Sequence, residues 1–206
     1  AMSTGSSTGG GHDCWASGTY THTGGGAYNY AQGGHSTIGG GVSNGAYDYC
    51  TTVGGGQSSY LYADYGVIAG GHNNYAYAYT STVAGGMYNV GSGNYSFLGG
   101  GSHNIAKGTM SVVGGGKRNL ATSAFGAVIG GQYNSAGQVA GIGGGEFNSA
   151  VGIISFVGGG GNNTVSGNAS AVAGGQKNEI TQSFSNIGGG KRNVVKSIYS
   201  SVGGGL

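Results

Sequence analysis

Apolar, polar and glycine positions recur along this chain at an almost constant spacing. Repeat units begin at residues 9, 24, 39, 54, 69, 84, 99, 114 and 129, and, after one fourteen-residue step, at 143, 158, 173, 188 and 203. Each unit opens with a glycine triplet, or with one apolar residue and a glycine doublet, as in GGGSHNIAKGTMSVV at 99–113. Such regular spacing is typical of stacked, nearly identical turns of chain, that is, of a solenoid.

Three columns of the repeat predict its hydrophobic core. We number the places of each unit from its first residue. Place fifteen is Val, Ile or Leu in every complete unit except the first, which has Thr23. Place eight holds small or branched apolar residues, for example Ala31, Ala106, Val165 and Ile180. Place twelve holds a bulkier series that includes Tyr95, Met110, Phe125, Ile154 and Phe184. We expect all three columns to face inward.

The spacing of these columns predicts short strands. Places eight and twelve share a parity, so residues 106–110 of the unit 99–113 are expected to form a strand with alternating faces. Residues 111–113 are expected to lead into a second strand or into the next corner. The glycines should form the corner, because a residue without Cβ accepts positive φ and lets another backbone approach.

A polar column accompanies the apolar ones. Place six is Asn in eleven of thirteen units, and Cys14 and Ser59 are the exceptions. This column either stacks from coil to coil, with each amide bonding its neighbour or capping the adjacent turn, or consists of simple turn formers. Both interpretations predict the same fold.

Composition narrows the fold class. The chain of 206 residues has 53 glycines, no proline and 6% charged residues. Repeated glycines disfavour an α-helical repeat by roughly 1 kcal/mol each, and the absence of proline and of a three-residue glycine period excludes collagen. We therefore predict an all-β, parallel β-solenoid, or β-roll, of about thirteen 15-residue coils.

The repeat also sets the domain boundaries. Residues 1–8 are expected to be an N-terminal segment or cloning remnant, with Ala1-Met2 as the remnant itself, and residues 9–206 a single repeat domain. That domain is expected to be a fragment of a longer fibre protein, with either processing or a cloning boundary at Leu206. No stretch approaches the roughly 20 apolar residues of a membrane span, so we expect no membrane insertion by this segment.

The thin core predicts self-association. About three inward apolar side chains per coil cannot offset the conformational entropy of fifteen ordered residues. A lone coil therefore cannot fold, and exposed apolar places favour burial against further copies. Glycine columns that let backbones meet around an axis make a homotrimer the simplest closed assembly.

Aromatic residues are concentrated in the first half of the chain. Thirteen of fifteen Tyr lie at or before Tyr95, all five His at or before His103, and all Lys and Arg from Lys107 onward. Places seven, nine and eleven should face outward and form a contiguous aromatic strip, which is the expected ligand-binding site or, alternatively, a subunit interface. Its residues are Trp15, Tyr30, Tyr47, Tyr49, Tyr60, Tyr62, Tyr75, Tyr77 and Tyr79.

Other candidate chemistry is weak. The two GGGKRN segments at 114–119 and 188–193 lack the P-loop spacing and a following Ser or Thr. We therefore expect their Lys-Arg pairs to be turn residues, and an anion-binding site is the less favoured alternative.

The five histidines fall in four columns and the five acidic residues share no column in neighbouring coils, so we expect no metal, cofactor or catalytic residues. Cys14 and Cys50 are too far apart for a disulfide and are expected to be free thiols. A net charge of +2 gives no argument for nucleic acid.

The units GGGSHNIAKGTMSVV, AGGMYNVGSGNYSFL and GGGGNNTVSGNASAV resemble the head repeats of trimeric autotransporter adhesins of the YadA-like kind, and glycine-rich repeats of trimeric tail-fibre-like proteins. The likeness covers residues 9–205, although the unit here has fifteen residues rather than fourteen. It implies a trimeric, left-handed parallel β-roll outside a bacterium or on a phage-like fibre. It provides no catalytic residues.

Pattern and resemblance together predict a function. We expect an extracellular, non-catalytic adhesive fibre or receptor-binding module that attaches to a glycan or another polymer on a target cell. One alternative is an ice-binding β-solenoid, since Thr37, Thr52 and Thr82 share a column, although Val67 interrupts it. Another alternative is a passive spacer that holds a different domain at a distance.

Overall fold

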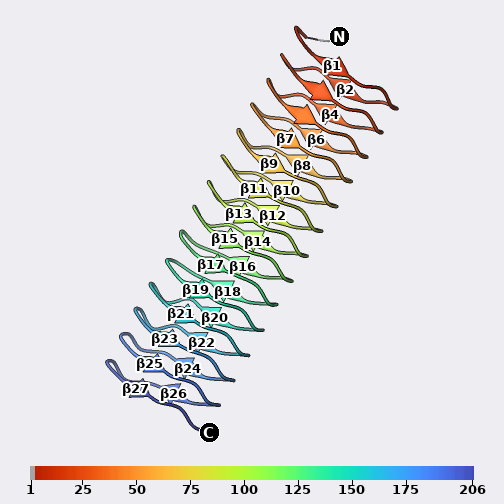
Figure 1. The fold of residues 1–206 in the computed structure, drawn as a ribbon. Coiled ribbons are helices and arrows are strands. Elements are labelled where there is room, and N and C mark those ends of the chain that lie inside the picture. Colours follow the sequence, from red (N-terminus) through yellow and green to blue (C-terminus); the bar gives the residue numbers. More distant parts are fainter. Residues whose placement is uncertain (1–2) are drawn as a thin grey trace. The chain divides into compact units, whose positions relative to one another are not determined.

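The computed structural model describes residues 3–206, and these residues form no helix. Parallel strands stack into a β-solenoid of about thirteen turns, which confirms the predicted architecture. The chain divides into two compact units, residues 3–103 and 104–206, and each is described by itself. Figure 1 shows the strands of each unit stacked coil upon coil. Ala1 and Met2, the expected cloning remnant, lie outside the described residues.

Two parallel ladders build the unit of residues 3–103. Successive strands pair fifteen residues apart, as in Trp15 with Tyr30 and Thr37 with Thr52. The first ladder begins within the expected N-terminal segment and contains β1 (Ser7–Thr8), β3 (His22–Thr23), β5 (Thr37–Ile38), β7 (Thr52–Val53), β9 (Val67–Ile68), β11 (Thr82–Val83) and β13 (Phe97–Leu98). The second contains β2 (Trp15–Ala16), β4 (Tyr30–Ala31), β6 (Gly45–Ala46), β8 (Tyr60–Leu61), β10 (Tyr75–Ala76) and β12 (Val90–Gly91).

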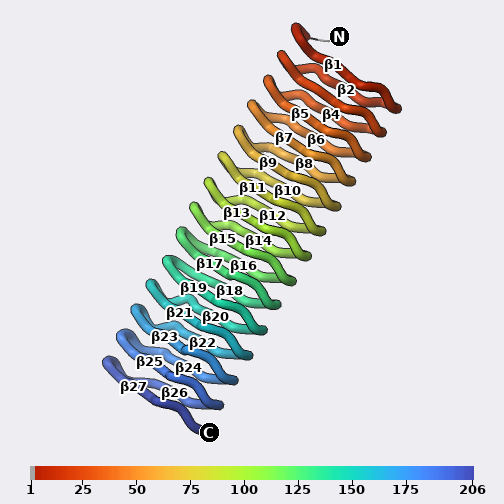
Figure 2. The backbone as a smooth tube through the Cα atoms, viewed as in Figure 1, coloured from red at the N-terminus to blue at the C-terminus, as the bar shows by residue number. Residues whose placement is uncertain are grey.

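The unit of residues 104–206 repeats the same coil, and its turns can be followed in Figure 2. One ladder contains β15 (Val112–Val113), β17 (Ala127–Val128), β19 (Gly141–Ile142), β21 (Phe156–Val157), β23 (Ala171–Val172), β25 (Asn186–Ile187) and β27 (Ser201–Val202). The other contains β14 (Ile105–Ala106), β16 (Leu120–Ala121), β18 (Ser135–Ala136), β20 (Ser149–Ala150), β22 (Thr164–Val165), β24 (Glu179–Ile180) and β26 (Val194–Val195).

The apolar core consists of two columns, at places eight and fifteen. Each is the second residue of a two-residue strand, and its side chain points inward. Place fifteen is fully buried at Ile38, Val53 and Leu98, for example, and place eight at Ala46 and Leu61. Each buried Val, Leu or Ile contributes about 1.5–3 kcal/mol. The predicted inward columns at these two places are confirmed.

The expected core column at place twelve is wrong. Met110, Phe125 and Ile154 expose about half or more of their side-chain surface. In each fifteen-residue coil the residue at place twelve has a left-handed backbone, as has Val139 at place eleven of the fourteen-residue unit, with φ between 48° and 58°. Place five has the same geometry. A left-handed residue breaks the alternation of faces that a continuous strand would impose. The expected strand over 106–110 is therefore reduced to Ile105–Ala106, and the side chain at place twelve turns outward.

These left-handed residues reverse the direction of a backbone hydrogen bond. Strand N–H groups donate to the following coil, as Trp15 does to the carbonyl of Asn29 at 2.8 Å. The N–H of Tyr65 instead donates to the carbonyl of Tyr49 in the preceding coil, at 2.9 Å. Each coil is therefore bonded to its neighbour in both directions, which satisfies backbone groups at the turns.

Polar columns form the rest of the interior. The place-six Asn side chains are buried, except for the half-buried Asn193, and they bond both their own corner and the next coil, so the two expected roles occur together. Nδ2 of Asn29 donates to the carbonyls of Gly25 at 2.7 Å and Gly41 at 2.8 Å, while its Oδ1 accepts from the N–H of Asn44 at 3.0 Å. A second buried polar column, mostly Ser, occupies place thirteen.

The glycine at place three forms a close contact between coils. Gly116 has φ of +90°, and a Cβ built on it would lie 2.1 Å from the carbonyl oxygen of Gly131. Backbone conformation and available space thus both require glycine there. The second glycine is less constrained, since a Cβ on Gly115 would meet nothing within 4 Å.

Candidate binding surface of residues 3–103

All nine predicted aromatic residues are exposed or half-buried, as expected. They do not form one strip, however. Ring contacts divide them into a stacked cluster, a row along the adjoining turns and an isolated pair. We name these the tyrosine cluster, the corner row and the Trp15 pocket.

The tyrosine cluster contains Tyr47, Tyr60, Tyr62, Tyr75 and Tyr77. At place nine, the ring centroids of Tyr47 and Tyr62 are 4.7 Å apart and those of Tyr62 and Tyr77 are 5.6 Å apart, with interplanar angles of 10° and 6°. At place seven, Tyr60 stacks on Tyr75 with centroids 5.7 Å apart. The spacing follows that of adjacent strands, because each ring belongs to the next coil.

A glycine allows Tyr47 to join this cluster. Gly45 occupies place seven on β6, and a Cβ there would lie 2.4 Å from Cε2 of the Tyr47 ring. The ring covers the strand where other coils carry a side chain. Burial, followed by the neighbouring Tyr62 and Tyr60, raises the pKa of Tyr47. Burial also raises the pKa values of Tyr60 and Tyr77, so the cluster disfavours charge on its hydroxyls.

The corner row runs along the turns after the place-seven strands. Tyr49 and Tyr79, which the sequence assigned to the strip, make edge contacts with Tyr65 at 5.8 and 5.6 Å. The row continues in both directions and contains Tyr20, His35, Tyr49, Tyr65, Tyr79 and Tyr95. Its four additional members were missed because place twelve was expected to be buried. Beside Tyr49, the thiol of Cys50 raises the pKa of the phenol.

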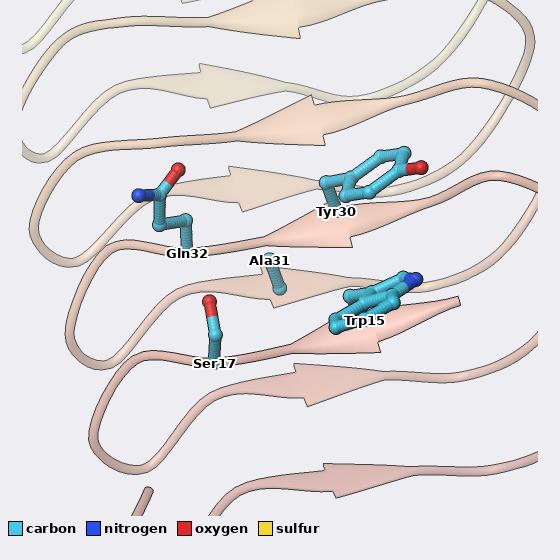
Figure 3. Close-up of a pocket in the computed structure, with 5 residues that line it drawn as sticks. All are labelled: Trp15, Ser17, Tyr30, Ala31 and Gln32. Atoms are coloured by element: carbon cyan, nitrogen blue, oxygen red, sulfur yellow. The ribbon is translucent and has the colours of Figure 1, made fainter. Parts of the chain in front are cut away.

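Trp15 and Tyr30 line a pocket of about 420 Å³ together with Ser17, Ala31 and Gln32. Figure 3 shows the two rings at one end of the pocket, the side chains of Ser17 and Gln32 at the other, and Ala31 between them. Trp15 is 54% exposed and Tyr30 is 42% exposed. Within the described chain, neither ring stacks on another aromatic ring, in contrast to the cluster.

Sequence reasoning missed the polar side of this pocket. Ser17 and Gln32 occupy place nine, the column that Tyr47 and Tyr62 fill in later coils. Because places seven and nine share a face, their polar side chains could have been assigned to the same surface as Trp15 and Tyr30.

The remaining candidates form no second site in the part of the chain that the structure describes. No group of three or more His, Cys, Asp or Glu is arranged to hold a metal ion among residues 3–206. Cys14 and Cys50 are free, as predicted. In the first GGGKRN segment, Arg118 donates to the Tyr133 hydroxyl at 3.1 Å, with its guanidinium carbon 5.4 Å from the ring centroid.

The threonine column has the interruption that the sequence indicates. Thr52 pairs with Val67, and Val67 pairs with Thr82. Thr82 in turn pairs with Phe97, which ends the column. The ladder therefore presents no continuous rank of threonines.

No protein-family model matches the chain, and no curated protein is significantly similar to it. None of the described residues lies in a helix that is long and apolar enough to cross a membrane.

Proposed function

We propose that this chain is an extracellular, non-catalytic attachment module, and that residues 3–103 bind a glycan or a similar polymer on a target surface. The supporting observation is the run of aromatic side chains over successive coils, from Trp15 on β2 to Tyr75 on β10. A surface that repeats at strand spacing suits an extended ligand better than a compact one. Tyr and Trp suit such contacts because a broad apolar ring carries a polar group at low entropic cost.

Serine substitutions in the tyrosine cluster test this function. The variant Tyr60→Ser, Tyr62→Ser, Tyr75→Ser and Tyr77→Ser should bind target cells or purified surface polysaccharide at least tenfold more weakly than the unmodified chain. A matched variant with Phe147→Ser and Phe156→Ser removes similarly exposed aromatic surface from the other unit and should bind normally. Equal binding by all three proteins would contradict a role of the tyrosine cluster in attachment.

The proposed assembly is a homotrimer displayed on a bacterial surface or a phage-like fibre. Its support is the exposed apolar column at place twelve in residues 104–206, which includes Met110, Phe125, Ile154 and Phe184. Large apolar side chains are disfavoured when exposed, and association would cover them. Mass measurement in solution should give three times the mass of the chain, whereas a solitary subunit would contradict the assembly and leave the binding surface unaffected.

A further inference from the structure

We propose that the Trp15 pocket binds a single neutral pyranose residue, with the Trp15 ring as the platform and Ser17 and Gln32 as hydrogen-bonding groups. This inference rests on the proposed function, since it specifies which part of the aromatic surface recognises a sugar ring and what charge that sugar carries.

Ring geometry separates the pocket from the tyrosine cluster. A pyranose ring binds an aromatic side chain by placing its weakly positive C–H groups against the negative face of the ring. In the cluster, both faces of Tyr62 are covered by the nearly parallel rings of Tyr47 and Tyr77. Tyr62 therefore presents mainly its edge and its hydroxyl, which can bond a polymer but cannot stack on a sugar ring.

Trp15 and Tyr30 have no such covering. Neither ring makes an aromatic contact within the described chain, although the two residues are partners in the β2–β4 ladder. Gly45 follows Tyr30 in the place-seven column and interrupts the row of strand-borne rings, and the ring of Tyr47 lies over this position. The pocket thus leaves aromatic faces available beside an open volume.

The pocket also offers free polar groups. The Trp15 indole N–H, the Tyr30 hydroxyl, the Ser17 hydroxyl and the Gln32 amide make no hydrogen bond within the described chain. A pyranose carries donors and acceptors around its rim, so these groups could bond its hydroxyls while the ring lies on Trp15. Each such bond contributes about 0.5–1.5 kcal/mol. The volume of about 420 Å³ lies at the small end of the range of roughly 300–1,000 Å³ for ligand pockets, as expected for one sugar ring.

Local charge favours a neutral sugar. Residues 3–103 contain no Lys or Arg, and their acidic residues are Asp13, Asp48 and Asp64. A uronate or sulfated sugar would therefore find no lysine or arginine in this unit to pair with its anion. Loss of its hydration would remain uncompensated in such a site.

The single tryptophan makes the inference directly measurable. We expect the methyl glycosides of glucose, galactose, mannose or N-acetylglucosamine to include at least one that changes Trp15 fluorescence saturably, with a dissociation constant of about 1–10 mM. Methyl glucuronide should bind at least tenfold more weakly than the best neutral glycoside. Absence of saturation with every neutral glycoside, or a preference for the glucuronide, would overturn the proposal.

Substitutions then place the ligand. By isothermal titration calorimetry, Trp15→Ala and Gln32→Ala should each weaken binding of the best neutral glycoside at least tenfold, while Phe156→Ser should leave it within twofold. Trp15 and Gln32 are exposed, so unchanged far-ultraviolet circular dichroism is expected to show that both variants fold. Normal glycoside binding by Trp15→Ala would overturn the assignment of the pocket.

Comparison with the cell-binding assay distinguishes this inference from the proposed function. If the unmodified chain adheres to target cells but binds none of the glycosides, the pocket inference fails and the attachment function stands. If glycosides bind at Trp15 but the chain adheres to no cell or polysaccharide, the attachment function fails and the pocket stands.

Discussion

The side chain of Asn119 accepts two hydrogen bonds from Asn134. The backbone N–H and Nδ2 of Asn134 both lie 3.1 Å from Oδ1 of Asn119. Nδ2 of Asn119 in turn donates to the carbonyls of Gly115 and Gly131. One buried amide thus joins its own glycine corner to the next coil.

Removing that amide should be costly. Asn119→Ala leaves the buried N–H of Asn134 without its acceptor, and we expect the free energy of unfolding to fall by about 3 kcal/mol in urea denaturation. The natural exception at Ser59 provides the reverse test, since its hydroxyl lies 3.4 Å from the N–H of Asn74. Ser59→Asn should restore the ladder and stabilise the protein by about 1 kcal/mol. A loss of stability on Ser59→Asn would contradict this role of the amide column.

Substitution by alanine in the buried serine column at place thirteen should raise stability rather than lower it. The hydroxyls of Ser81 and Ser111 are buried and have no hydrogen-bond partner, and Ala140 occupies the equivalent place in another coil. Removing an unpaired buried hydroxyl relieves its desolvation cost, so Ser81→Ala and Ser111→Ala should each raise stability by about 0.5–1 kcal/mol. Thr51, whose hydroxyl bonds the carbonyl of Asp48, provides the control, because Thr51→Ser should give no such gain.

Adjacent glycines should differ sharply in their tolerance of a methyl group. Gly116→Ala places Cβ against the carbonyl of Gly131 on a backbone with φ of +90°, and it should prevent close stacking of two coils. Gly115→Ala enters open space. We expect a large fall in the thermal midpoint for the first variant and a change of a few degrees at most for the second. Similar midpoints would show that the close contact between Gly116 and Gly131 does not determine the stability of this corner.

Left-handed apolar residues should be strained. Ile154 is β-branched, 63% exposed and has φ of 58°. Asn tolerates this conformation better, so Ile154→Asn should raise the free energy of unfolding of the dissociated chain by about 1 kcal/mol. The neighbouring Ile153 is also exposed but lacks positive φ, and Ile153→Asn should give no gain. Measurement at low protein concentration avoids any contribution from association.

Tyrosine ionisation should destabilise the cluster at high pH. Burial and neighbouring phenols raise the pKa of Tyr47 above its usual value of 10.0, so the folded state retains a proton that the unfolded chain begins to release. This stabilising contribution is complete below pH 10 and is lost as pH rises through the folded pKa. The thermal midpoint should therefore decline above that pH while tyrosinate absorbance rises. Tyr47→Phe should weaken the decline, and an unchanged decline would exclude Tyr47 as its source.

The sequence predicted the buried apolar columns and the asparagine column, because these features depend only on the length of the repeat. Val53 and Leu61 are buried because their columns recur in every coil, and Asn29 bonds its neighbours because it has the same place as Asn44. The prediction that place twelve faces the core was wrong because residues such as Met110 have a left-handed backbone. Left-handed positions are usually occupied by Asn, Asp or Gly, so the residue types at place twelve do not indicate this geometry.

The binding surface was only partly predictable for a related reason. The outward direction of Trp15 and Tyr30 follows from alternation along a strand. The division of the aromatic residues into cluster, row and pocket does not follow from alternation, because it depends on which rings are in contact. Tyr47 joins the cluster only through the space over Gly45, a contact between side chain and backbone that a column pattern does not contain.

The fourteen-residue unit at 129–142 shows where this repeat accommodates a change in length. Both ladders keep their register across it, since Ser135 pairs with Ser149 and Ala127 with Gly141. The N–H of Val139 still donates to the carbonyl of Ala124. The segment between β18 and Val139 is therefore the one that is shorter by a residue than in the other coils. This bend is therefore the natural place to graft a foreign peptide, because a deletion there leaves the strands on either side undisturbed.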